Sequence, residues 1–133
     1  MSRHQSTQRP VHLGLKASAV VQAQFTNQPE CCSAYLAGHA SDGIKGRLMT
    51  THGFTNRRST WQMHPSGAEV VLCMAGTIAF SPGPAHGSVT RIDLPAGEYA
   101  IKPLGVWHTA NAKAAVAYAL TTAGRGTERR ERH

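Results

Sequence analysis

The most informative stretch of the chain is Trp61-Gln62-Met63-His64-Pro65-Ser66-Gly67-Ala68-Glu69, and six residues separate it from Gly76. A second stretch, GEYAIKPLGVWHTAN, occupies residues 97–111 and contains His108. Side chains alternate between the faces of a strand, so Gln62 and His64 share one face. The Pro-Ser-Gly turn then reverses the chain, which allows Glu69 to return beside His64. His108 follows a turn of its own at a strand start. The two stretches therefore predict that two imidazoles and one carboxylate converge.

Glu69 stands in an unusual setting. It is the only acidic residue between Gly43 and Ile92, and it precedes the apolar run Val-Val-Leu-Cys-Met. An ionised carboxylate that leads a buried strand is costly unless it is paired or bound to a cation. Two His and one carboxylate with open coordination positions hold Fe(II) in non-haem proteins, and the same set suits Mn, Zn or Ni. The alternative is a hydrogen-bonded His–Glu–His cluster that lines a ligand pocket without an ion.

The rest of the chain reads mostly as strands and turns. Short runs rich in alternating, β-branched or aromatic residues are separated by Gly, Pro, Ser and Asn clusters at a spacing of about 8–12 residues. This pattern is typical of an antiparallel sandwich or barrel, so we predict an all-β fold. One helix is considered, over residues 17–24. The predicted strands are residues 11–15, 47–52, 59–64, 69–74, 77–80, 89–94, 99–102, 107–110 and 116–122.

The two stretches resemble the two sequence motifs of the cupin superfamily. The first motif has Gly, His-x-His, three or four residues, Glu, six residues and Gly; the second has Gly, five residues, Pro-x-Gly, two residues, His, three residues and Asn. Two positions depart from this pattern: Gln62 stands where the first His is expected, and Asn111 comes one residue early. The matching positions are His64, Glu69 and Gly76 in the first motif, and Gly97, Pro103, Gly105 and His108 in the second.

The resemblance implies an antiparallel jelly-roll β-barrel, or double-stranded β-helix, over residues 11–123. The type implied is a small single-domain protein (monocupin, cupin_2-like, RmlC-like), often a homodimer. The implied metal ligands are His64, Glu69 and His108, with Gln62 as a candidate fourth ligand through its amide oxygen. The implied cofactor is a divalent ion of iron, manganese, zinc or nickel. Because the family includes members that have lost their metal, a metal-free site remains the alternative.

The expected function is that of a metal-dependent enzyme, of oxygenase or isomerase type, acting on a small organic molecule. The ion would polarise a substrate oxygen or bind O₂ at the position that the missing His leaves open. Tyr99 and His52 are candidates for a catalytic role; packing in the core for Tyr99, and a surface position for His52, are the alternatives. The other class of function is a non-catalytic barrel that binds or senses a small ligand.

Length and composition set the remaining expectations. A chain of 133 residues is long enough to form one domain with its own core. No run reaches the roughly 18 apolar residues that a membrane span requires. Residues 1–10 lack the apolar centre of a signal peptide, and the cysteines (three, two of them adjacent) fit a reducing compartment. We therefore expect a cytoplasmic protein without a membrane partner.

The formal net charge of +7 lies largely at the two ends of the chain. Residues 1–10 carry Arg3 and Arg9, and residues 124–133 carry four arginines against two glutamates. We expect a mobile N-terminal segment over residues 1–10 and a basic flexible tail over residues 124–133. Nucleic-acid binding is not expected, because it requires basic residues clustered on one folded face with aromatic partners.

Overall fold

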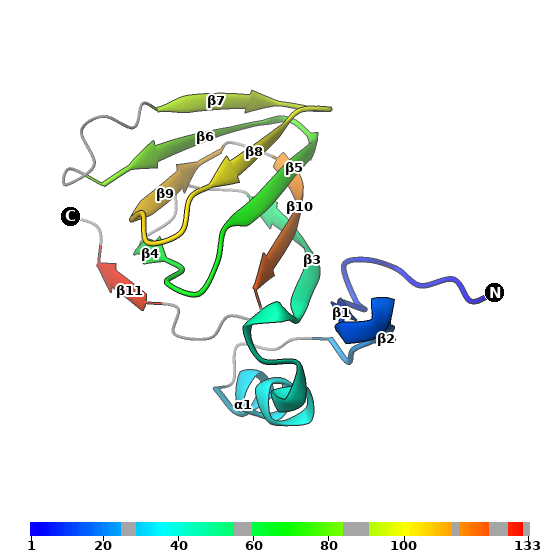
Figure 1. Cartoon of the computed structure of the whole chain (residues 1–133). Helices are drawn as coiled ribbons and strands as arrows, with labels where there is room; N and C mark the ends of the chain where they lie inside the picture. The colour runs from blue at the N-terminus through cyan, green and yellow to red at the C-terminus, as the bar shows by residue number, and fades with distance from the viewer. Residues whose placement is uncertain (25–28, 55–59, 84–90, 113–114, 123–127, 132–133) are drawn as a thin grey trace.

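The computed structural model (Figure 1) describes residues 1–24, 29–54, 60–83, 91–112, 115–122 and 128–131. Among these residues, no helix is both long and apolar enough to cross a membrane. The helical elements are η1 (Leu15–Ala17), α1 (Pro29–Gly38) and η2 (Ala40–Lys45), and the strands are β1 (Val11–Leu13), β2 (Ala19–Val21), β3 (Arg47–Phe54), β4 (Thr60–Met63), β5 (Glu69–Ala75), β6 (Thr77–Pro82), β7 (Ile92–Pro95), β8 (Tyr99–Lys102), β9 (His108–Asn111), β10 (Ala115–Thr122) and β11 (Glu128–Glu131).

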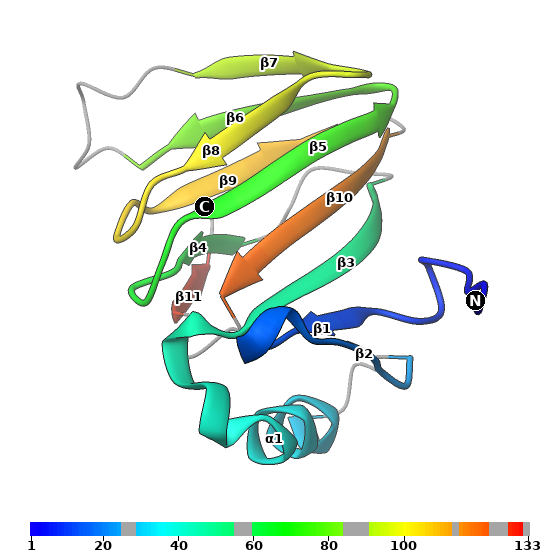
Figure 2. The same ribbon diagram turned by 45° about the vertical axis from the view of Figure 1, so that its right-hand side comes forward.

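The strands form two facing antiparallel sheets (Figure 2). One sheet has the order β2-β1-β3-β10-β5-β8, and the other has the order β11-β4-β9-β6-β7. Neighbours in both sheets are mostly not consecutive in the chain, as in a jelly roll. The predicted all-β antiparallel jelly roll is therefore confirmed. Its core consists of Val71, Cys73, Ile78, Phe80, Leu94, Ala100, Ala110 and Ala115.

Strand alternation decides which side chains enter the space between the sheets. In β5, Glu69 is buried on the same face as the core residues Val71 and Cys73. In β8, Ala100 and Lys102 are buried, while Tyr99 and Ile101 are exposed on the outer face. The two strands pair with Glu69 opposite Lys102. A carboxylate and an ammonium thus enter the barrel side by side.

Glycines of both motifs occupy backbone conformations that suit a residue without Cβ. Gly76 joins β5 to β6 with a φ of 73°, and Gly97 precedes β8 with a φ of 90°. These values lie in the left-handed region, where other residues are strained. Gly97 also donates its backbone N–H to the carbonyl of Cys73 at 2.8 Å. The motif spacing therefore reflects turns that position β5 and β8 against each other.

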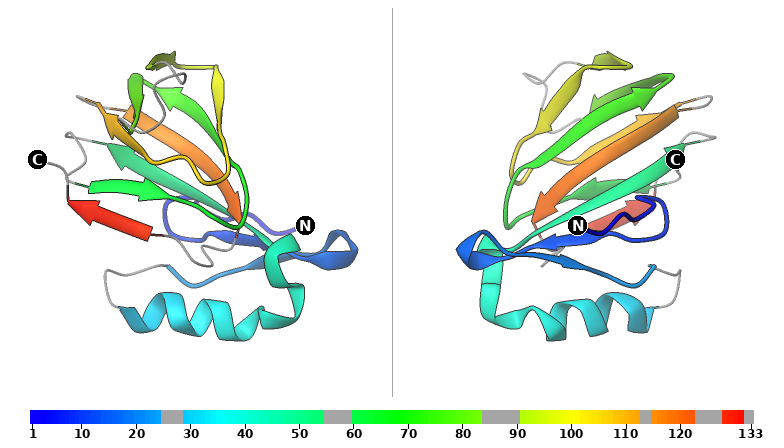
Figure 3. Two further views of the ribbon diagram at one scale, coloured as in Figure 1. Left: turned by 60° about the vertical axis from the view of Figure 1, so that its left-hand side comes forward. Right: turned by 90° about the vertical axis from the view of Figure 1, so that its right-hand side faces the viewer.

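The N-terminal half departs from the sequence prediction. The helix considered over residues 17–24 is not formed: Ala19–Val21 form the edge strand β2, paired with β1, as suits two successive valines. Helix α1 was not predicted, because its sequence, PECCSAYLAG, has no clear apolar stripe. Figure 3 shows α1 outside the two sheets, beside the β1–β2 hairpin. Its Tyr35 is buried.

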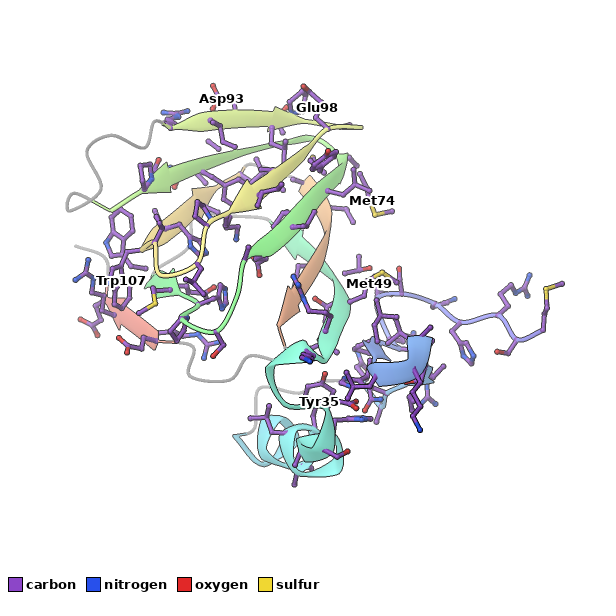
Figure 4. All side chains as sticks on the ribbon, in the orientation of Figure 1. Tyr35, Met49, Met74, Asp93, Glu98 and Trp107 are labelled. Atoms are coloured by element: carbon purple, nitrogen blue, oxygen red, sulfur yellow. The ribbon has the colours of Figure 1, made fainter. Side chains whose placement is uncertain are left out.

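The C-terminal end also departs from expectation. Residues 128–131 were predicted as part of a flexible tail, but they form β11, which pairs with β4 at the edge of the five-stranded sheet. The guanidinium of Arg130 lies over the ring of Trp107 at 4.2 Å, which anchors the strand by a cation–π contact. Figure 4 labels Trp107 near this end of the molecule. Residues 124–127 lie outside the described residues. The mobility of residues 1–10 stays a prediction.

Candidate metal centre

The structure brings His64, Glu69 and His108 together at one end of the barrel. His64 directly follows β4, Glu69 begins β5, and His108 begins β9. Each side chain offers one ligand atom, and these atoms all lie within 4.8 Å of one another. Nε2 of His64 is 3.5 Å from Oε2 of Glu69, and the rings of the two histidines are 5.5 Å apart. The predicted convergence is therefore present; the role of these residues as metal ligands stays a prediction.

The imidazole of His108 is held in one orientation. Its Nδ1 lies 3.2 Å from the backbone carbonyl of Val106, a contact in which the ring N–H donates. Its Nε2 is then the lone-pair atom, and it lies 3.1 Å from Nζ of Lys102. Burial, and next the charge of Lys102, lower the pKa of His108 from 6.5 to about 3. The ring is therefore neutral, as a metal-binding imidazole must be. The hydrogen bond from Nδ1 to the backbone carbonyl of Val106 fixes the orientation of the ring and leaves Nε2 as the nitrogen that can bind a metal.

Lys102 is the residue of the site that the sequence analysis missed. Its ammonium forms an ion pair with Oε1 of Glu69, hydrogen-bonds His108 and lies 4.6 Å from the centroid of the Phe80 ring. Its side chain is 8% exposed. The available signal was strand alternation, because Lys102 shares a face with Ala100 directly before Pro103. A buried lysine on that face needs an anionic partner.

Glu69 is ionised in this arrangement. Burial raises the pKa of its carboxyl, but the charge of Lys102 and the hydrogen bond from its ammonium outweigh burial, and the net pKa lies below the ordinary value of 4.5. The prediction that this carboxylate requires a charged partner is therefore correct. Lys102 supplies that partner.

The three donors suit a divalent cation by their chemistry and their spacing. Two imidazole nitrogens and a carboxylate oxygen bind iron, manganese, zinc or nickel and leave coordination positions open. However, the Lys102 ammonium contacts two of these donors, Oε1 of Glu69 and Nε2 of His108. An ion bound by all three side chains requires the ammonium to move away. The donor set fits a metal, but Lys102 competes with it.

A cavity of about 370 Å³ lies against this cluster. Its polar wall includes Lys102 and His108, whereas His64 and Glu69 do not line it. The rest of the wall is mostly apolar and consists of Phe80, Ser81, Pro82, Ile92, Ala100, Ile101, Pro103 and Val106. Its volume is near the lower end of the usual range for small-molecule sites. A ligand in this cavity would meet the ammonium before the carboxylate.

The other predicted site residues lie in different surroundings. Gln62, in β4, is half-buried and faces His108 in the strand register, so it is close enough to remain a candidate ligand. Tyr99 is 65% exposed on the outer face of β8, so the alternative of core packing is wrong. A catalytic role for Tyr99 stays a prediction. His52 is exposed, and its Nε2 lies 2.8 Å from the hydroxyl of Thr50. A catalytic role for His52 stays a prediction.

A second polar cluster ties the N-terminal strand to α1. His12 is 1% exposed; its Nδ1 lies 2.5 Å from the hydroxyl of Tyr35 and its Nε2 lies 2.6 Å from Oδ2 of Asp42. The hydrogen bond from His12 lowers the pKa of Asp42. His39 stacks on His12 at 3.8 Å with 19° between the rings. Imidazole lone pairs lie in the ring plane, so two stacked rings do not aim at one ion. We interpret this cluster as structural.

Comparison with known proteins identifies the fold. No protein-family model and no curated protein matches the chain. A cupin-2 domain containing protein from Shewanella frigidimarina is 23% identical, with 57% of this chain and 70% of that chain covered and a TM-score of 0.50. A cupin-like protein from Thermotoga maritima is 17% identical, and the TM-score is 0.54. The match covers 64% of this chain and 65% of the Thermotoga chain.

An oxalate oxidase is also similar, at 19% identity and a TM-score of 0.51. The match covers 69% of this chain and only half of that chain. At such identities the likeness shows the fold and leaves activity open. The chain has the cupin fold, as its two motifs predicted.

Proposed function

We propose that this protein is a metal-dependent cupin that acts on a small organic molecule. The observation that carries the proposal is the convergence of His64, Glu69 and His108 within 4.8 Å beside a cavity of about 370 Å³. When bound there, a divalent ion would act as a Lewis acid on a substrate oxygen. Oxygenase and isomerase chemistry are the two reaction types that we consider.

The chain's own residues would perform three tasks in such a reaction. The carbonyl of Val106 orients His108 and keeps its Nε2 lone pair directed into the site. Phe80, Ile92 and the other apolar residues of the wall would contact the apolar part of a bound molecule. Lys102 places a positive charge at the boundary between the cavity and Glu69. A bound ligand would therefore be oriented by one polar end.

A second candidate function is a non-catalytic barrel that binds a small ligand without metal. The position of Lys102 favours it, because an ammonium that contacts Glu69 and His108 satisfies these two side chains as a metal ion would. The missing first His of the motif, replaced by Gln62, favours it as well. In this case the cavity and Lys102 together form the binding site.

Metal content separates the two candidates. Metal-free protein is dialysed against zinc, manganese, iron(II) or nickel and analysed for bound metal. We expect one ion per chain in the wild-type protein and in His4→Ala, an exposed-histidine control, and loss of the ion in His64→Ala and Glu69→Gln. Absence of stoichiometric metal from wild-type protein under all four conditions would contradict the metal-dependent function and favour the second candidate.

We also propose that the protein forms a homodimer in the cytoplasm. Exposed apolar side chains gather on the outer face of β5 and β8, and Figure 4 shows Met74 projecting outward from this sheet. Such a patch is typical of an interaction surface. It consists of Leu72, Met74, Tyr99 and Ile101. Light scattering with Ile101→Lys, which should yield monomers, tests the dimer.

A further inference from the structure

The charge of Lys102 determines which kind of ligand can bind in the site together with a metal ion. Without metal, its ammonium is held by Glu69 and His108, and its side chain is 8% exposed. An ion that takes Glu69 and His108 removes both contacts from the ammonium. The lysine still projects from β8 toward the inside of the barrel, so its charge remains close to the ion.

The charges of the cluster balance only in the metal-free state. Glu69 and Lys102 offset each other, and His108 is neutral because its Nε2 accepts a hydrogen bond from the Lys102 ammonium while its Nδ1 donates to the carbonyl of Val106. A divalent ion adds two positive charges to a site that contains a single carboxylate. Burying such an excess charge is costly unless an anion accompanies it.

Among the described residues that line the cavity, none has an anionic side chain that could restore the balance. Of its ten lining residues, only Lys102 carries a charge. In the neighbouring strand β7, Ile92 lines the cavity, whereas the adjacent acidic residue Asp93 points to the opposite face, is 64% exposed and pairs with Arg91. The missing negative charge therefore has to come with the ligand.

We propose that the ligand of this site is a small organic acid whose carboxylate pairs with the Lys102 ammonium and binds together with the metal. The inference rests on the proposed metal-dependent function and adds the ligand class to it. The mostly apolar wall receives the hydrocarbon part of such an acid. Metal and carboxylate bind cooperatively, because each relieves the charge that the other leaves unbalanced.

Calorimetric titration of zinc into metal-free protein tests the proposal. Isobutyrate is the carboxylate probe, isobutyramide is the uncharged probe of the same shape, and inorganic phosphate distinguishes a carboxylate site from a general anion site. We expect isobutyrate to raise the zinc affinity of wild-type protein at least about fivefold, at the lower end of usual coupling between two ligands. Isobutyramide and phosphate should leave it unchanged.

Variants at the lysine complete the test. Lys102→Met should bind zinc more tightly than the wild type without any acid, and it should lose the gain from isobutyrate. Lys45→Met, which removes an exposed lysine, should behave as the wild type. Equal gains from isobutyrate and isobutyramide in wild-type protein, or an equal gain from phosphate, would overturn the carboxylate assignment while zinc binding stands. Absence of zinc binding from both wild type and Lys102→Met would overturn the proposed metal-dependent function itself.

Discussion

The ion pair between Lys102 and Glu69 predicts a destabilisation that depends strongly on pH. Replacing Lys102 by Met keeps most of the side-chain volume and leaves Glu69, which is 7% exposed, without its cation. A buried carboxylate avoids the full cost by taking up a proton. From an ordinary pKa of 4.5, protonation at pH 7 costs about 3.4 kcal/mol, and at pH 5 it costs about 0.7 kcal/mol. The expected loss in free energy of unfolding is therefore about 3 kcal/mol at pH 7 and below about 1 kcal/mol at pH 5.

Urea unfolding followed by circular dichroism, with EDTA present, measures this loss at both pH values. Lys45→Met is the matched control, and as an exposed substitution it should change stability by less than about 0.5 kcal/mol. The double variant Lys102→Met/Glu69→Gln should recover much of the loss, because no buried charge remains. A loss for Lys102→Met that equals that of the control, or that is the same at pH 5 and pH 7, would refute this account of the pair.

Three further results are expected. Acid should destabilise the metal-free protein: the pKa of His108 is about 3 when folded against an ordinary 6.5, so below pH 6.5 the unfolded chain binds a proton that the folded chain does not. The free energy of unfolding then falls by up to about 1.4 kcal/mol for each unit by which the pH is lowered. Urea unfolding of His108→Asn should show a weaker dependence of this free energy on pH. Tyr35→Phe removes the hydroxyl that meets Nδ1 of buried His12 and should cost about 1–3 kcal/mol in urea unfolding, whereas exposed Tyr99→Phe should cost little; equal effects would contradict the structural role of the His12 cluster. Arg130→Ala should cost about 0.5–1 kcal/mol and change the fluorescence of Trp107, whose ring it covers; unchanged fluorescence would contradict the docking of β11.

The barrel was predictable because its motif residues are required by local geometry. Gly76 and Gly97 adopt positive φ values at turns that pair the strands, and these turns set the spacing of the motifs. The same spacing brings His64 beside Glu69. Such requirements involve residues that are close together in the sequence, so they can be recognised from one sequence alone.

The features that were missed depend on contacts between distant parts of the chain. The role of Lys102 becomes visible only when β8 is placed in register with β5, which sets the lysine opposite Glu69. The strand β11 is polar and exposed, and its docking depends on β4 and on the ring of Trp107. Helix α1 lacks an apolar stripe and is held through Tyr35 by His12, which lies 23 residues earlier. Sequence pattern alone does not encode these pairings.

Anomalous diffraction at the zinc edge, from crystals of zinc-loaded protein, would locate an ion bound by His64, Glu69 and His108. We expect one peak at about 2.0–2.2 Å from a nitrogen of His64, an oxygen of Glu69 and Nε2 of His108. We also expect the ammonium of Lys102 to have moved away from Glu69. A crystal with no peak between these three side chains, in which Lys102 still joins Glu69 to His108, would contradict the claim that they form a metal centre.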